Sequence, residues 1–299
     1  MCFSFFAMEV SRTMAEGNCV SSAELKNATG VVYIDCHCHL ADKDFDKDIE
    51  EVVTEAKKTG VKAALVCATS TGEFEKVLTL ADRFPDFVLP CFGVHPVQGA
   101  LTGDQKCVTL QDLEEAVPLI EKYHDRLGAI GECGLDFQPR ITQTAEDKDV
   151  QRQVLSKQVE LANKYDLPLN VHSRSAGRPT IALLKEQGAK KVLMHAFDGN
   201  PKYAMEGVKE GYFFSIPPSI IRSEQKQKLV KALPVESLLL ETDSPALGPQ
   251  KQERNVPSNI AVSCNYIAEV KKMDPGQLSR LSTQNALKLF PKLARFVVK

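Results

Sequence analysis

From Val31 onward, short runs of apolar and β-branched residues alternate with longer amphipathic segments. This alternation predicts successive βα units and a parallel sheet, because each helix returns the chain to the start of the next strand. Eight strands are predicted, at residues 31–35, 63–68, 87–93, 127–132, 167–172, 191–195, 211–216 and 237–242. Eight is the strand count of a closed barrel, whereas an open doubly wound sheet more often has about five or six. The sequence therefore predicts an α/β protein with a (β/α)8 TIM barrel.

The segments between the predicted strands have the apolar periodicity of helices that pack one face on a sheet. They are residues 46–58, 73–84, 110–123, 149–165, 178–187 and 223–233, with two more at 257–272 and 277–290 after the last strand. No linker rich in Pro, Gly or Ser interrupts the series, so residues 31–299 are predicted to form one domain. Residues 1–30 show no clear periodicity and are expected to be a flexible N-terminal extension.

Composition excludes several classes of protein. The 299 residues are 43% hydrophobic and 25% charged, which is typical of a globular chain, and the net charge of -2 gives no general basic surface for nucleic acid. Any nucleic acid must therefore be bound locally. The nine cysteines form no CxxC pair, no apolar run is long enough to span a membrane, and the first residues lack the basic start of a signal peptide. We expect an intracellular protein, cytoplasmic or nuclear and not secreted, with no membrane partner.

Polar residues gather at the carboxyl ends of the predicted strands, where (β/α)8 barrels carry their active sites. His37 and His39 follow the first strand two residues apart, so both side chains are expected to point into the barrel mouth, above Asp35. By the same alternation, Cys36 and Cys38 are expected to face the helices. Five of the six histidines occupy such strand ends; the exception is His124, which we interpret as a surface or core residue.

The other strand ends supply further candidate metal ligands, namely Glu132, His172, His195 and Asp243. Together with the first two histidines they make four imidazoles and two carboxylates, a ligand set typical of first-row divalent ions. We expect two divalent cations per chain, with Zn, Mn, Co and Mg as candidates. A metal pair needs a bridging ligand, and a carboxylate can present one oxygen to each ion. Glu132 is the candidate bridge.

The residues around these ligands resemble one family. The strings IDCHCHL, GVHP, GECGLDF, NVHSR, HAFDG and ETDSP occur in this order, between about residues 31 and 291. They resemble the TatD-type deoxyribonucleases, which are metal-dependent hydrolases on (β/α)8 barrels. The resemblance implies that one ion is bound by His37, His39, Glu132 and Asp243, and the second by Glu132, His172 and His195. The chain departs from the commoner GEIGLD and HCFSG strings at Cys133, Ala196 and Asp198, which lie beside ligands without removing one.

These features predict a divalent-metal-dependent hydrolase of phosphodiester bonds, a deoxyribonuclease whose substrate is DNA or another phosphodiester. A water activated by the ions would attack phosphorus while Asp243 holds and deprotonates that water. The predicted catalytic residues are Asp243 and Glu132. Arg174 can bind a phosphate with two hydrogen bonds, or instead form a salt bridge at the rim.

Two residues carry a functional and a structural interpretation side by side. His95, in GVHP, can contact a phosphate or the leaving oxygen, or be an ordinary rim histidine. Asp136, in GLDF, can orient a ligand histidine from behind or form a turn.

Two alternative functions are kept open. A barrel amidohydrolase acting on a small ester, amide or lactone would share the histidines and the final aspartate, but often bridges its metals with a modified lysine on the fourth strand, where this chain has Glu132. A non-catalytic binding protein braced by metal would be expected to have a closed, cysteine-rich site, whereas this ligand set leaves room for water.

Overall fold

The computed structural model describes residues 31–99 and 105–297, so the predicted extension at residues 1–30 lies outside the described residues. Its main feature is an eight-stranded parallel sheet, in which each strand pairs with the next along the chain. Each predicted strand is present, as β1 Tyr33–Cys38, β2 Val61–Cys67, β3 Val88–Phe92, β6 Ala129–Gly134, β7 Leu169–His172, β8 Val192–Met194, β9 Phe213–Ile216 and β10 Leu238–Leu240. The predicted TIM barrel is thereby confirmed.

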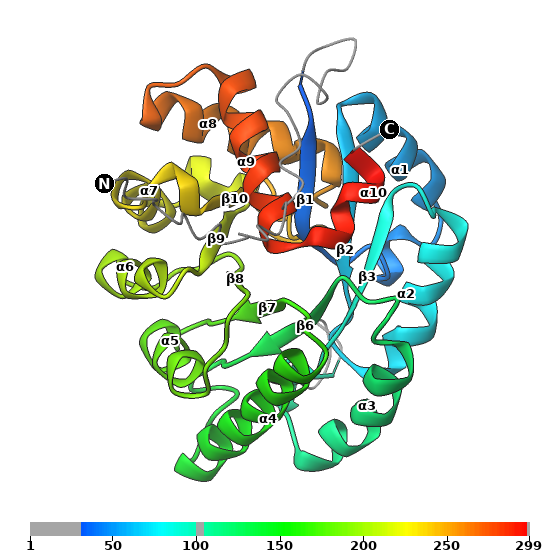
Figure 1. Cartoon of the computed structure of the whole chain (residues 1–299), viewed down its shortest axis with the longest axis vertical. Coiled ribbons are helices and arrows are strands. Elements are labelled where there is room, and N and C mark those ends of the chain that lie inside the picture. The colour runs from blue at the N-terminus through cyan, green and yellow to red at the C-terminus, as the bar shows by residue number, and fades with distance from the viewer. Residues whose placement is uncertain (1–30, 100–104, 298–299) are drawn as a thin grey trace, which may run out of the picture.

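Backbone hydrogen bonds just beyond the last strand bring the two edges of the sheet together. The Asp243 N–H donates to the His37 carbonyl at 2.9 Å, and the His39 N–H donates to the Ser244 carbonyl at 2.7 Å. The barrel therefore closes at its mouth, between the residues that the sequence marked as candidate ligands. Figure 1 shows the strands at the centre of the molecule with helices around them.

The helices form an outer layer around the strands. The last part of the chain also covers the end of the barrel opposite the mouth. The helices are α1 Ile49–Lys58, α2 Thr71–Arg83, α3 Leu110–Tyr123, α4 Ala145–Lys164, α5 Gly177–Glu186, α6 Pro201–Lys209, α7 Glu224–Ala232, α8 Ile260–Lys271, α9 Pro275–Leu289 and α10 Ala294–Val297. Short 3-10 turns are η1 Lys43–Phe45, η2 Pro218–Arg222, η3 Val235–Ser237, η4 Pro257–Asn259 and η5 Pro291–Leu293. Among the described residues, no helix has the length and apolar character needed to cross a membrane.

Some elements were not predicted. Helix α6 is nine residues long and has only Ala204 and Gly207 as buried residues, so its signal in the sequence is short. The hairpin of β4 Val97–Gln98 and β5 Lys106–Cys107 has two residues in each strand, too few to show alternation. Helices α3 and α4, by contrast, begin with capping boxes, Thr109 with Asp112 and Thr144 with Asp147, and both were predicted.

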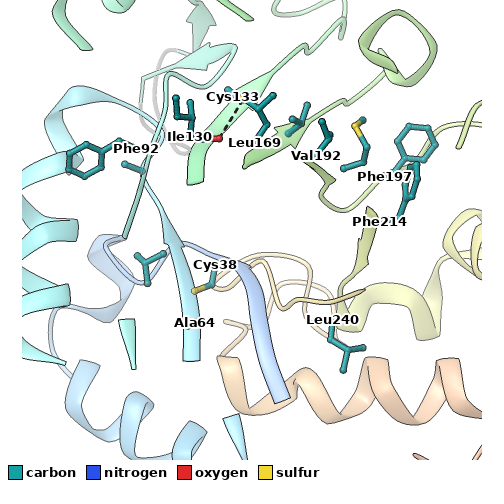
Figure 2. Close-up of a cluster of buried hydrophobic side chains, with 14 of the residues drawn as sticks. Cys38, Ala64, Phe92, Ile130, Cys133, Leu169, Val192, Phe197, Phe214 and Leu240 are labelled. Carbon is teal, nitrogen blue, oxygen red and sulfur yellow. Dashed lines mark hydrogen bonds between the residues drawn. The ribbon is translucent and has the colours of Figure 1, made fainter. Parts of the chain in front are cut away.

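The buried apolar side chains form two layers. The larger lies between the strands and the helices, and Figure 2 shows strand residues in it such as Leu169, Val192 and Leu240. The smaller fills the barrel interior and continues into Phe290 and Phe296, which close the end away from the mouth. A barrel packed in this way leaves its mouth as the place for chemistry.

The predicted orientation of one cysteine is wrong. Cys38 packs in the layer between strands and helices, as expected, but Cys36 packs inside the barrel. The pairing of β1 with β2 shifts register between Asp35 and Cys38, so the regular alternation of side chains fails within this strand. The seven cysteines of the described residues are all free thiols.

Candidate metal centre

The structure brings the six predicted ligands together at the barrel mouth. His37 lies near the end of β1 and Glu132 within β6, while His172 is the last residue of β7. His39, His195 and Asp243 lie in the loops that follow β1, β8 and β10. All six are fully or largely buried, although His39 and His172 keep some exposure to solvent. Because parallel strands end at the same rim, residues more than 200 positions apart meet there.

One group of ligand atoms surrounds a point between β1 and β10. The Nε2 atoms of His37 and His39 are 3.0 Å apart. Oε2 of Glu132 lies 3.7 and 3.3 Å from these two nitrogens, and Oδ1 of Asp243 lies 3.4 Å from each. Ligands bound tetrahedrally at about 2.0 to 2.2 Å from a metal are separated by about 3.3 to 3.6 Å. The four atoms therefore fit one divalent ion.

A second group gathers around the other oxygen of the same carboxylate. Oε1 of Glu132 lies 2.8 Å from Nε2 of His195, 3.0 Å from Nδ1 of His172 and 3.3 Å from Nε2 of His95. The facing nitrogens of His172 and His195 are 3.4 Å apart. These spacings also match the edges of a coordination shell. Glu132 thus directs one oxygen at each group, as a bridging ligand must.

Three of the histidines are held from behind by a hydrogen-bond acceptor. Nδ1 of His37 is 2.8 Å from Oδ1 of Asn170, and Nδ1 of His39 is 3.0 Å from the carbonyl of Cys67. Nε2 of His172 is 3.2 Å from Oδ2 of Asp136. A ring nitrogen that donates to such an acceptor carries the proton, so the opposite nitrogen keeps its lone pair for a metal.

Asp136 makes both contacts that the sequence left open. Its Oδ2 faces His172, and its Oδ1 accepts a hydrogen bond from the Gln138 N–H at 2.9 Å, which shapes the local turn. Burial alone would lower the pKa of His172, but hydrogen bonds to Asp136 and Glu132 raise this pKa to about 9. The two carboxylates therefore favour positive charge between them, whether from a proton or from a cation.

His195 differs from the other ligand histidines. Its Nδ1 lies 3.8 Å from Oε2 of Glu241 and has no hydrogen-bond partner among the described residues. Burial and the neighbouring ring of His37, stacked on it at 3.7 Å, lower the pKa of His195 to about 4. The ring is therefore neutral at pH 7, the form in which an imidazole binds metal.

Three buried polar residues support the ligands; the sequence placed Asp35 below His37 and His39 without giving it a role, and sequence reasoning missed the other two. Asp35 accepts hydrogen bonds from the Thr242 N–H at 2.8 Å and hydroxyl at 2.5 Å, which ties β1 to the segment after β10. Asn170 and Glu241 complete the set. Burial raises the pKa of Asp35 to about 7 and that of Glu241 to about 8. The available signal was a polar residue inside an apolar strand, as Asn170 is in β7.

The two candidate substrate contacts occupy different positions. His95 lies within the centre, close to Glu132, rather than on the rim. Arg174 is exposed, two residues beyond His172, and its guanidinium forms no ion pair or hydrogen bond with any described residue. The salt bridge considered as an alternative for Arg174 therefore has no partner in this part of the chain.

Replacing Asn170 with alanine should weaken the ion on the His37 side by about 10- to 100-fold, the range typical of residues that orient ligands. The ring of His37 would lose the acceptor that fixes its orientation, while His172 would keep its contact with Asp136. Competition with a chelator measures this change. Asn163→Ala, which alters an exposed amide of α4, is the matched control and should bind both ions like the parent. An unchanged affinity in Asn170→Ala would show that His37 does not depend on this contact.

A closed parallel barrel whose mouth gathers histidines and carboxylates at these spacings defines a class, the metal-dependent hydrolases built on (β/α)8 barrels. The comparison with known families is more specific. Residues 34–291 match the model described as TatD related DNase, and the chain belongs to this family.

Individual relatives agree with this placement. The chain is 61% identical to Deoxyribonuclease TATDN3 of Homo sapiens over 91% of its own length and 99% of that protein. It is 30% identical to the 3'-5' ssDNA/RNA exonuclease TatD of Erwinia tasmaniensis, over 86% and 98% of the two chains. Among solved structures, YJJV, a TatD homologue from Escherichia coli K12, superposes with a TM-score of 0.76 at 27% identity, covering 87% of this chain and 98% of the other.

Proposed function

We propose that the chain is a deoxyribonuclease that hydrolyses phosphodiester bonds with two divalent ions bridged by Glu132. The observation that carries this proposal is the orientation of that carboxylate, with Oε2 toward His37 and His39 and Oε1 toward His172 and His195. The names of the relatives, a deoxyribonuclease and a single-strand exonuclease, support a nucleic acid substrate.

The residues of the chain divide the work of hydrolysis. When bound, two ions at these positions would make a water acidic and offset charge on the phosphate oxygens. Although burial raises it, hydrogen bonds from His37 and His39 hold the pKa of Asp243 well below its usual value. Asp243 is therefore an ionised carboxylate that can orient the attacking water, and its proposed role is to accept the proton of that water. His95 is placed to hydrogen-bond a phosphate oxygen or the leaving oxygen beside Glu132.

The test is the substrate range of the purified protein, supplied with Mg, Mn, Co or Zn. We expect hydrolysis of single-stranded DNA, and of a phosphodiester chromophore at a lower rate because it lacks neighbouring phosphates. A lactone should not be hydrolysed. Hydrolysis of the lactone without cleavage of DNA or RNA would contradict the proposal and favour an amidohydrolase.

Arg174→Ala should lower kcat/KM for DNA by about tenfold without changing metal content, because the lost contact is one charge-assisted hydrogen-bond pair to a phosphate. The slope of log Kd for DNA against log salt concentration should decrease by about one, the contribution of about one phosphate contact. Arg178→Ala removes another exposed arginine four residues along, one that stacks on Tyr203. That control should behave like the parent; equal losses in the two variants would show that Arg174 has no specific role.

A further inference from the structure

Helix α7 buries a cation close to the metal centre. The side chain of Lys226 is 3% exposed, although neighbouring lysines of the same helix face solvent. Its Nζ donates to the carbonyl of Ala196 at 2.8 Å and pairs with Oδ1 of Asp198 at 2.5 Å. Burying an ammonium group is costly unless its position satisfies a specific set of acceptors. Here the acceptors belong to the loop that follows β8.

The loop is bound on both sides of one residue. Ala196 directly follows His195, and its φ of 43° lies in the left-handed region that alanine disfavours. Its N–H donates to Oε1 of Glu241 at 2.9 Å, and its carbonyl accepts from Lys226. A buried carboxyl group and a buried ammonium group thus hold the two ends of Ala196 in a conformation that it would not keep by itself.

This fixation matters because His195 lacks the hydrogen bond that orients the other ligand histidines. In His37, His39 and His172, the ring nitrogen that faces away from the metal centre has a hydrogen-bond acceptor within 3.2 Å. Nδ1 of His195 has none among the described residues. The direction of its ring, with Nε2 2.8 Å from Glu132, must therefore be set by its backbone and by stacking on His37.

We infer that Lys226 is a positioning residue for His195, and that it sets the affinity of the ion on the His172–His195 side by holding the Ala196 turn. The inference rests on the proposed two-ion site. It also gives a role to Asp198, one of the positions at which this chain departs from the commoner string of its family. In the sequence, Lys226 lies three and four residues before the buried Leu229 and Val230, on the apolar face of the helix.

The test compares Lys226→Met with Lys228→Met in the full chain. Lys228 is two residues along the same helix, 65% exposed, and pairs with Glu224. Titration of metal-free protein with Mn²⁺, followed by calorimetry and by electron paramagnetic resonance, resolves the two binding steps. For Lys226→Met we expect one step at the parental affinity and the other weakened by about tenfold, the lower end of the range for residues that support ligands. Lys228→Met should match the parent.

The outcomes separate the inference from the proposed function. If the parent binds fewer than two Mn²⁺ ions, the two-ion site itself is wrong. If the parent binds two and Lys226→Met binds both at parental affinity, or weakens both equally, the positioning role is wrong. Asp198→Asn keeps the bond from Lys226 to Ala196 and should weaken the same step by less than Lys226→Met does. If Lys226→Met does not fold, Lys226→Gln, with a shorter neutral side chain, is judged by the same criteria.

Discussion

Replacing Glu132 with glutamine is expected to lower turnover by at least about 100-fold, beyond the 10- to 100-fold typical of residues that only support ligands. Glutamine keeps the shape of the side chain but removes its charge and one of the two acceptor oxygens. Because each carboxylate oxygen faces a different group of histidines, the affinities for both ions should fall together. Turnover on single-stranded DNA and metal stoichiometry measure the two effects.

Two companion variants make this result specific. His195→Ala should weaken mainly one ion, since an imidazole nitrogen can serve only one. Glu160→Gln changes an exposed carboxylate paired with Lys157 and should leave turnover and metal content unchanged. Thermal melting should show that all three proteins keep the fold, because the apolar layers of the barrel are untouched. If Glu132→Gln turns over like the parent with both ions in place, the bridge is assigned to the wrong residue.

Asp243→Asn should reduce kcat by about 1,000-fold, within the range of about 10²- to 10⁴-fold that proton transfer by a positioned side chain contributes. The amide can neither accept the proton of the attacking water nor offset the charge of an ion. Oδ1 of Asp243 lies 3.4 Å from the nitrogens of both His37 and His39, so the loss of metal affinity should be largest on that side. Single-turnover kinetics at saturating metal separate the chemical step from metal loss.

The exposed Asp166 offers the matched control, since Asp166→Asn removes a carboxylate that pairs with Lys191 outside the metal centre. It should retain parental kcat. A decrease of less than about tenfold in Asp243→Asn at saturating metal would assign the proton acceptor to another group, because such a change lies below the contribution expected of a catalytic base.

The barrel could be predicted because its strands are buried on both faces and appear in the sequence as nearly continuous apolar runs. The candidate centre could be predicted because parallel strands end at one rim. A polar residue that follows an apolar run is therefore expected to lie at the barrel mouth. Glu132 illustrates this, since it was placed at the mouth because it ends the predicted strand at residues 127–132.

The features that were missed depend on tertiary contacts. The inward position of Cys36 follows from a register shift between β1 and β2, which depends on how the two strands pair. Asn170 supports His37 from 133 residues away, and Lys226 reaches Ala196 from 30 residues away. Nothing local in the sequence indicates such partners. The sequence position of Lys226 on the apolar face of α7 is consistent with its burial, but it does not identify Ala196 as the partner.

The most direct test of the two-ion centre is anomalous diffraction from crystals grown with Mn²⁺ or Zn²⁺. We expect two anomalous peaks per chain, about 3.5 to 4 Å apart as in other two-metal sites, with one oxygen of Glu132 bound to each ion. One peak should also contact His37, His39 and Asp243, and the other His172 and His195. A single peak at saturating metal, or two peaks without Glu132 between them, would show that Glu132 does not bridge two ions.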